Sequence, residues 1–282
     1  MFFKALVGFL NKRELIYIMG KIIGIISLKG GVGKTSTVTA LGDAMSDFDK
    51  KVLLVDGNLS APNLGMHLNV IDPEKTLHHV LRGEANPRDA IHKLENFDMM
   101  PSSLYDRSQV NPLKLKDKLK SLKKKYDVIL VDSPPSMNEE TMGVMNASDE
   151  IFIVTTPDYP TMSTTLKTAK IIKQRGAPLT GLIINKVHKK NFELSTEDIE
   201  RTTEVPVMAV LPHDINVLKA QSKFKPSTRH KPKSEASDEI KRLAATLLGE
   251  KYSPVKLRKP FRRINPKRQD INRTIFYESL FK

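Results

Sequence analysis

A glycine-rich stretch with two lysines, residues 27–36, has the composition of a loop that binds phosphate groups. It reads Ser-Leu-Lys-Gly-Gly-Val-Gly-Lys-Thr-Ser. Glycines let successive backbone N–H groups converge on phosphate oxygens, and a helix that follows adds the positive end of its dipole. Lys34 is placed to reach the β- and γ-phosphates of a nucleotide, and the Thr35 hydroxyl is placed to ligate Mg²⁺. The stretch therefore predicts a phosphate-cradling loop.

The segments on either side of this loop have the patterns of a strand and of a helix. Residues 21–26 form a short apolar run rich in β-branched side chains, which is typical of a buried strand. After the loop, Val38, Leu41 and Met45 recur at helical spacing. A phosphate loop requires this passage from strand to helix, so the context agrees with the motif.

Two other predicted strands end in an aspartate. Asp56 follows the apolar run 52–55, and Asp132 follows the run 126–131. Ligands of open α/β sheets gather beyond the carboxyl ends of the strands, so we expect both carboxylates near the phosphates. An acid at the end of such a strand matches the Walker B pattern, in which the carboxylate holds Mg²⁺ directly or through water. We predict a metal site made of Thr35, Asp56 and Asp132.

The alternation of strands and helices predicts an α/β fold with a mostly parallel sheet and helices on both faces. Further strands are predicted at 97–101, 150–156, 179–184 and 205–211, and further helices at 76–83, 86–94, 112–125, 161–175 and 235–248. We expect residues 20–249 to form the folded domain. Residues 1–19 are an N-terminal extension, which is either an interfacial helix or lies upstream of a true start at Met19. Residues 250–282 form a basic C-terminal tail.

Charge is concentrated at the end of the chain. The net charge is +14, and residues 219–282 hold 18 Lys and Arg against 6 Asp and Glu, whereas residues 1–218 hold 28 against 26. A basic end predicts contact with a polyanion, either nucleic acid or anionic lipid, and the alternative is a solvated extension without a role. The lysine-rich segment 112–125 is either a solvated helix face or a DNA-contacting patch.

The chain has no cysteine, which excludes disulfides, zinc–thiolate sites and cysteine-held iron–sulfur clusters. No apolar run approaches the length that is needed to span a bilayer. We therefore expect a cytoplasmic protein, peripheral on the inner face of the membrane or associated with the nucleoid.

Five motifs in this order, K-G-G-x-G-K-T, D-x-N, D-S-P-P, N-K and P-H-D, resemble the MinD/ParA family of deviant P-loop ATPases over about residues 20–249. The general P-loop pattern has a glycine where Leu28 stands, and the additional Lys29 resembles the signature lysine of the family. The resemblance implies a Rossmann-like P-loop fold and a slow ATPase that uses ATP and Mg²⁺. It also implies a homodimer that forms with ATP, and a partner protein, unknown here, that stimulates hydrolysis.

The resemblance also implies roles for individual residues. Asn185 would read the adenine, and Lys29 would reach the nucleotide of the partner chain as an arginine finger does. Asn58 stands where many relatives carry a second aspartate; an amide can orient water but cannot accept its proton, which predicts slow turnover unless another group positions the water. The predicted catalytic residues are Lys29, Lys34, Asp56 and Asn58. The predicted nucleotide-binding residues are Lys29, Gly30, Gly31, Val32, Gly33, Lys34, Thr35, Ser36, Asn185, Pro212 and Asp214.

Three functions fit these features. The segment 56–65 resembles MinD-like members more than DNA-partition members, which more often follow the aspartates with Pro-Gln. The first function is therefore a MinD-like, ATP-dependent dimerisation switch that helps to place a division site or a related structure. The second is a ParA-like partition ATPase that binds DNA non-specifically through its basic region. The third is a regulatory adaptor that binds nucleotide with little turnover.

Overall fold

The computed structural model describes residues 20–106, 108–253 and 266–281, so the expected N-terminal extension 1–19 lies outside the described residues. The strands are β1 (Lys21–Ile26), β2 (Val52–Asp56), β3 (His92–Lys93), β4 (Asp98–Met100), β5 (Val128–Asp132), β6 (Glu150–Thr155), β7 (Leu179–Val187) and β8 (Val207–Pro212). The helices are α3 (Lys34–Ser46), α4 (Leu64–His67), α5 (Leu77–Arg82), α6 (Leu115–Lys120), α7 (Glu139–Ala147), α8 (Tyr159–Gln174), α9 (Thr196–Thr203), α10 (Ile215–Gln221), α11 (Ser227–His230), α12 (Glu235–Leu248) and α13 (Arg268–Leu280), with 3₁₀ turns at Pro112–Lys114 and Leu122–Lys124.

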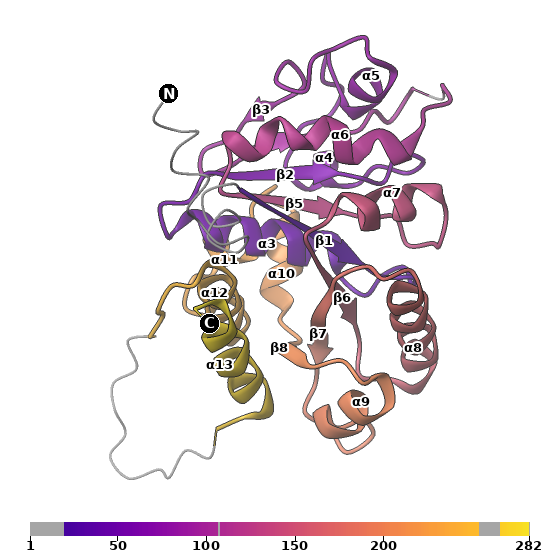
Figure 1. The fold of residues 1–282 in the computed structure, drawn as a ribbon. Coiled ribbons are helices and arrows are strands. Elements are labelled where there is room, and N and C mark those ends of the chain that lie inside the picture. The colour runs from indigo at the N-terminus through magenta and orange to yellow at the C-terminus, as the bar shows by residue number, and fades with distance from the viewer. Residues whose placement is uncertain (1–19, 107, 254–265, 282) are drawn as a thin grey trace.

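One eight-stranded sheet runs through the molecule in the order β3-β4-β2-β5-β1-β6-β7-β8 (Figure 1). Neighbouring strands are parallel except for the short antiparallel pair β3 and β4. The predicted fold class, an α/β fold with a mostly parallel sheet and helices on both faces, is confirmed. β1 lies in the middle, because β5, β2 and β4 extend the sheet on one side of it and β6, β7 and β8 extend it on the other.

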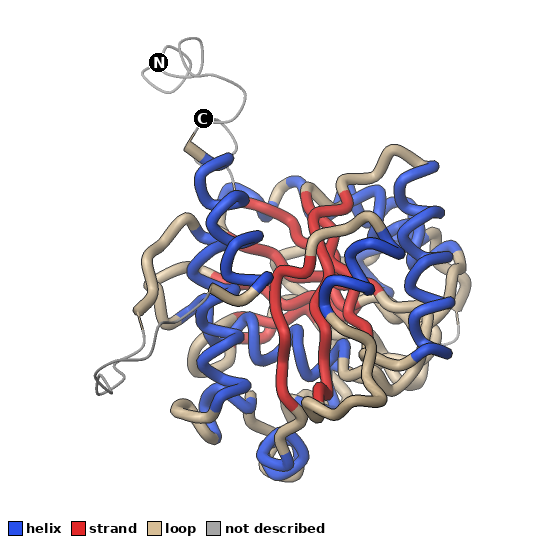
Figure 2. The backbone as a smooth tube through the Cα atoms, turned by 90° about the horizontal axis from the view of Figure 1, so that it is seen from below, coloured by secondary structure: helices blue, strands red, loops and turns tan. Residues whose placement is uncertain are grey.

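Apolar side chains alternate between the two faces of the sheet and build a separate core on each. In β1, Ile22 and Ile26 pack with helices α5 to α9, whereas Ile23 and Ile25 pack with α3 and α12. This alternation is the two-residue period of a strand, and burial of both faces is typical of a parallel sheet. Figure 2 shows the strands enclosed by helices on both sides. The sheet is therefore a rigid support for the loops at its carboxyl edge.

Two predicted helices differ from the structure. The helix predicted at 86–94 is wrong, because residues 87–90 form a turn and His92–Lys93 pairs antiparallel with Asp98–Met99. The N–H of Leu94 donates to the carbonyl of Phe97 at 3.1 Å, so hairpin pairing replaces the local helical pattern. The helix predicted at 112–125 is divided into a 3₁₀ turn, α6 and a second 3₁₀ turn. Its buried leucines still face the core, which is the property that the spacing predicted.

The C-terminal helix α13 packs against β8 and α12. β8 is the last strand of the sheet, and side chains rather than another strand meet its backbone. Asn272 donates to the carbonyl of Val207 at 2.8 Å, and Arg273 donates to the carbonyl of Met208 at 2.9 Å. Arg273 also forms a buried ion pair of 2.8 Å with Glu239 of α12. The predicted domain boundary at residue 249 comes directly after α12. Through its contacts with β8 and α12, helix α13 attaches the predicted C-terminal tail to the domain.

Candidate nucleotide-binding site

The phosphate-binding loop between β1 and α3 requires glycine at defined positions. Gly31 and Gly33 have φ angles of +78° and +90°, which lie in the left-handed region that favours glycine. A Cβ atom on Gly33 would lie 2.3 Å from Nδ2 of Asn185, so no other residue fits there without displacement of that amide. The backbone at Gly33 therefore approaches the end of β7 closely, and the loop is held in one conformation.

The start of α3 is suited to an anion. Its N-cap is Gly33, so no side chain caps the helix, and its first turn contains no acidic residue. In contrast, α7, α8, α9 and α12 each begin with an Asn, Asp or Ser whose side-chain oxygen accepts a backbone N–H. The first N–H groups of a helix have no partner within the helix and bind phosphate well. The lack of a cap at α3 thus fits a ligand that supplies the oxygens itself.

Lys34, Thr35 and Asp132 meet directly beneath the loop. The Lys34 ammonium donates to Asp132 Oδ1 at 2.6 Å and also to the carbonyl of Ser133. The Thr35 hydroxyl donates to Asp132 Oδ2 at 2.7 Å. Mg²⁺ in proteins is bound by one or two carboxylates together with hydroxyl, water and phosphate oxygens. Thr35 and Asp132 offer this set of donors, so the residues present fit a magnesium–nucleotide complex.

Asp56 lies next to Asp132, because the two residues are in register on the adjacent strands β2 and β5. Its carboxylate is fully buried and accepts the N–H groups of Asn58, Asn63 and Leu64 at 3.0–3.1 Å. Burial, together with the negative charge of Asp132, raises the pKa of Asp56 to about 7. A cation bound between the two acids would favour the ionised form of both.

The loop that follows Asp56 is held from both sides. Asn58 is buried, and its side-chain amide bonds within the loop: it donates to the carbonyl of Ala61 and accepts the N–H of Ala61 at 3.3 Å. Glu140 of α7 accepts the N–H of Leu59 at 3.0 Å and the hydroxyl of Ser60. The loop after Asp56 is therefore connected by hydrogen bonds to α7, the helix that follows Asp132.

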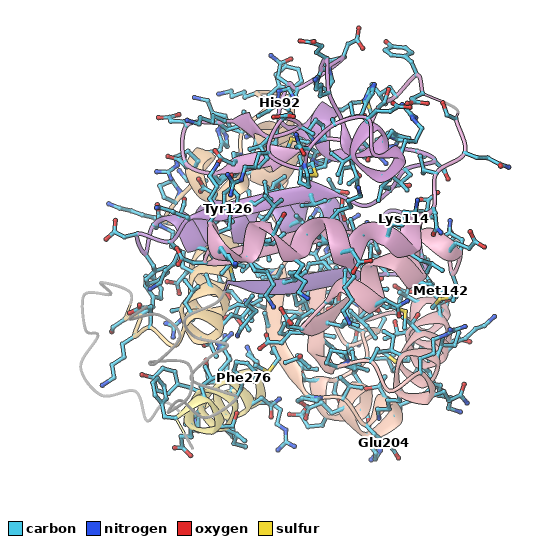
Figure 3. All side chains as sticks on the ribbon, turned by 45° about the horizontal axis from the view of Figure 1, so that its top comes forward. His92, Lys114, Tyr126, Met142, Glu204 and Phe276 are labelled. Carbon is cyan, nitrogen blue, oxygen red and sulfur yellow. The ribbon has the colours of Figure 1, made fainter. Side chains whose placement is uncertain are left out.

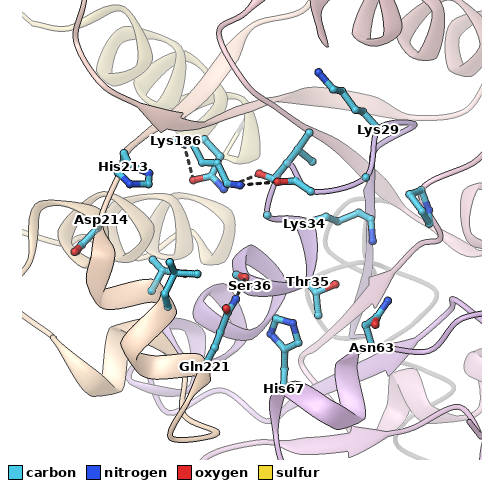
Figure 4. Close-up of a pocket in the computed structure, with 18 of the residues that line it drawn as sticks. Lys29, Lys34, Thr35, Ser36, Asn63, His67, Lys186, His213, Asp214 and Gln221 are labelled. Atoms are coloured by element: carbon cyan, nitrogen blue, oxygen red, sulfur yellow. Dashed lines mark hydrogen bonds between the residues drawn. The ribbon is translucent and has the colours of Figure 1, made fainter. Parts of the chain in front are cut away.

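Lys29 is directed away from Lys34, as Figure 4 shows. Its ammonium donates to the Thr161 hydroxyl at 2.5 Å and lies 3.5 Å from Asp158 Oδ1, both at the start of α8. The two lysines of the loop thus differ in environment. Lys34 is buried against Asp132, whereas the side chain of Lys29 is 41% exposed.

A cavity of about 450 Å³ opens in front of the loop (Figure 4). Every residue predicted for the catalytic and nucleotide-binding sets lines it except Asp56, which is buried with Asp132 behind the loop. Asn185 donates to the carbonyl of Val32 at 2.8 Å, which closes the loop against β7. Asp214 accepts the N–H of Asn216 at 2.9 Å and thereby caps α10. Burial acts to raise the pKa of Asp214, but this hydrogen bond and others from Ser234 and Asn216 hold that pKa below its ordinary value.

The lining residues that the sequence did not indicate include His67 and Gln221. Gln221 donates to the Ser36 hydroxyl at 2.7 Å and so connects α10 to the first turn of α3. It lies one helical turn after Val217, which also lines the cavity, so helical spacing could have identified it. His67 reaches the cavity from the end of α4, and no local pattern indicates this because its position depends on the path of the loop after Asp56.

A protein-family model described as an AAA domain matches residues 20–180, which is more than half of the chain. An uncharacterised ATP-binding protein of Methanocaldococcus jannaschii is 33% identical over 241 residues, which cover 84% of this chain and 91% of the relative. The cell division ATPase MinD of Pyrococcus furiosus is similar in structure, with a TM-score of 0.75, 36% identity and coverage of 80% of this chain and 97% of that one.

The chain belongs to the MinD/ParA family of P-loop ATPases. A further MinD/ParA structure, the septum site-determining protein MinD of Pyrococcus horikoshii, was solved with Mg-ADP and has a TM-score of 0.76 and 34% identity, with coverage of 81% of this chain and 96% of that one. MinD/ParA proteins are ATPases whose cofactors are ATP and Mg²⁺, and the donors around Asp132 suit both. The described part of the chain contains no helix that is long and apolar enough to cross a bilayer.

Proposed function

We propose that this protein is a MinD-like ATPase that works as an ATP-dependent dimerisation switch in the placement of a cellular structure, such as a division site. The observation that carries the proposal is the position of the two loop lysines. Lys34 is directed at the acids of its own chain, and Lys29 at the edge of the cavity, away from them. A lysine so placed is available to the nucleotide of a second chain, and similarity to septum site-determining proteins supports the placement role.

We propose a separate role for each group of residues in the site. Backbone N–H groups of 30–36 and the Lys34 ammonium hold the phosphates, and Asn185, Pro212 and Asp214 line the nucleoside end. Thr35 and Asp132, with Asp56 beside them, would hold Mg²⁺, which neutralises phosphate charge when it is bound. Lys29 would stabilise negative charge on the partner's nucleotide, and loss of the γ-phosphate would then weaken the dimer.

The first test is Lys29→Ala. We expect the variant to bind ATP as the unmodified protein does, because the Lys29 ammonium is turned toward α8 and away from Lys34, and to lose ATP-dependent dimerisation, because the contact across the interface is removed. Nucleotide titration and sedimentation velocity with ATP and with ADP measure the two properties. Lys170→Ala, which removes an exposed lysine on α8, is the matched control. A Lys29 variant that still dimerises with ATP contradicts the switch.

The second test concerns Asn58. We expect Asn58→Asp to raise the rate of phosphate release by at least about tenfold, because a positioned carboxylate can accept the proton of the attacking water. An aspartate carboxylate has no hydrogen to donate to the carbonyl of Ala61. The side chain would therefore also lose this hydrogen bond within the loop. Asn191→Asp, at an exposed asparagine that does not line the cavity, is the control. Equal rates in all three proteins would show that proton acceptance at this position does not limit turnover.

The polyanionic surface that the dimer would occupy is either an anionic membrane or DNA. The basic residues at the C-terminal end support both, and exposed lysines of 114–125, among them Lys114 in Figure 3, add positive charge in the described part of the chain. Sedimentation with anionic liposomes and, separately, with plasmid DNA, each with and without ATP, distinguishes the MinD-like from the ParA-like function. We propose a cytoplasmic protein that is peripheral on one of these surfaces.

A third function, a regulatory adaptor with little turnover, is supported by the buried Asn58. A steady-state phosphate-release assay, with and without candidate stimulating proteins, separates it from the switch.

A further inference from the structure

The imidazole of His67 lies at the phosphate end of the cavity. It lines the cavity together with Thr35 and Asn63, and Figure 4 shows it directed from α4 toward the first turn of α3, where Thr35 lies. The backbone N–H of His67 donates to the carbonyl of Asn63 at 3.2 Å, which forms the turn that presents the ring. His67 is therefore held at the end of the cavity where Lys34 and Thr35 would bind the terminal phosphates.

The ring of His67 is left for a ligand or for water. In the described part of the chain no protein group forms a hydrogen bond with this ring, and the side chain is half-buried at the cavity wall. By contrast, Nδ1 of His78 accepts the N–H of Ser103 at 3.2 Å, and Nδ1 of His79 accepts the N–H of Thr76 at 3.2 Å. Those two rings stabilise the backbone around α5, whereas the His67 ring forms no such bond.

The surroundings of His67 favour its neutral form. Burial lowers the pKa of the imidazole; the charge of Asp132 opposes this shift, and the charge of Lys34 adds to it. A neutral imidazole has one ring nitrogen with a free lone pair, which can accept a hydrogen bond or a proton.

The phosphate end of the cavity offers few other proton acceptors. Among the described residues that line the cavity, His213 and Asp214 also have side chains that can accept a proton, but both lie between β8 and α10 at the nucleoside end. Asn58 has an amide, which cannot accept a proton from water. Asp56 is buried behind the loop and does not line the cavity. His67 is therefore the lining side chain whose position and chemistry both suit an attacking water.

We propose that His67 accepts the proton of the water that attacks the γ-phosphate of ATP. The inference rests on the proposed function, in which hydrolysis ends the ATP-bound dimer. The water oxygen forms a bond to the γ-phosphorus, and the bond from that phosphorus to the bridging oxygen breaks. ADP keeps the electron pair of the broken bond. The water proton passes to the free nitrogen of the His67 ring and from there to solvent.

The expected effect is moderate. A positioned base contributes about 10²- to 10⁴-fold to the rate of a reaction that depends on proton transfer. The transition state of phosphoryl transfer is loose, so it gains less from removal of the proton than from the position of the water. Loss of the base is therefore expected to lower kcat by roughly 10- to 100-fold.

The test compares His67→Gln with His67→Glu. The two new side chains have the same shape, and only the carboxylate can accept a proton. At saturating ATP, we expect kcat for phosphate release to fall in His67→Gln and to be at least about tenfold higher in His67→Glu than in His67→Gln. His230→Gln, at a half-buried histidine on α11 that does not line the cavity, is the control and should match the unmodified protein.

Two measurements other than hydrolysis separate proton transfer from a structural role. Isothermal titration should give His67→Gln the ATP affinity of the unmodified protein, because Lys34 and the loop backbone hold the phosphates. Sedimentation velocity should show that the ATP-bound dimer of His67→Gln persists longer after free ATP is removed, because its nucleotide is hydrolysed more slowly.

An unchanged kcat in His67→Gln overturns the inference, and so do equal rates in the glutamine and glutamate variants, which would show that the ring acts through its shape alone. If the unmodified protein neither hydrolyses ATP nor dimerises with it, the proposed function itself fails. If the unmodified protein does both and the two His67 variants match each other, only the assignment of His67 is wrong.

Discussion

Lys34→Ala is expected to weaken ATP binding by about a hundredfold or more, because charge-assisted hydrogen bonds to phosphate each contribute ~1.5–3 kcal/mol. The ammonium is buried and held in place by Asp132 and the carbonyl of Ser133. Isothermal titration with ATP measures the loss. Lys29, the other lysine of the loop, is turned toward α8, and its alanine variant should retain binding.

The same substitution leaves Asp132 without its ion-pair partner, although the Thr35 hydroxyl still donates to it. The variant must therefore be shown to be folded, by circular dichroism and by a cooperative melt, before its binding is interpreted. A folded Lys34→Ala protein that binds ATP with unchanged affinity would contradict the assignment of this loop to phosphate.

Arg273→Ala is expected to lower the free energy of unfolding by ~3–5 kcal/mol, the usual cost of breaking a buried ion pair from one side. The Arg273 side chain is 6% exposed and Glu239 is 11% exposed, so Glu239 would remain in the interior without the cation that pairs with it, although the N–H of Val210 still donates to it at 3.2 Å. The carbonyl of Met208 would lose its donor as well. Urea denaturation followed by circular dichroism measures the change.

Arg268→Ala is the matched control, since Arg268 lies on the same helix and pairs with Glu200 at 2.6 Å while half exposed. Its loss is expected to cost no more than about 1 kcal/mol, because solvent screens exposed pairs. Equal, small losses in both variants would mean that α13 contributes little to the stability of the domain.

The local sequence predicted the parts of the fold whose burial pattern is simple. The run 21–26 became β1, and the helix 235–248 has the predicted bounds because its apolar spacing and Gly249 mark the face and the end. The order of motifs along strand ends also predicted which residues would meet, since carboxyl ends of parallel strands share one edge. Asp56 and Asp132 are in register for that reason.

Contacts between distant segments could not be predicted in the same way. Lys29 meets Asp158 at a sequence separation of 129 residues, and neither residue carries a local signal for the other. The helix predicted at 86–94 failed because pairing between His92 and Met99 depends on where β4 lies in the sheet. Gln221 reaches Ser36 only because α10 folds back over the start of α3. Such contacts follow from packing, which a single sequence does not specify locally.

The two outer strands of the described sheet, β3 and β8, affect how copies of the protein can associate when they are close together. β3 is only two residues long, and β8 is covered by Asn272 and Arg273, so neither border offers a row of free backbone groups to an incoming strand. Copies concentrated together are therefore poorly suited to grow into fibres by adding strand to strand at these borders. Their association is left to loops and helix surfaces, which separate again more readily than an extended β-structure.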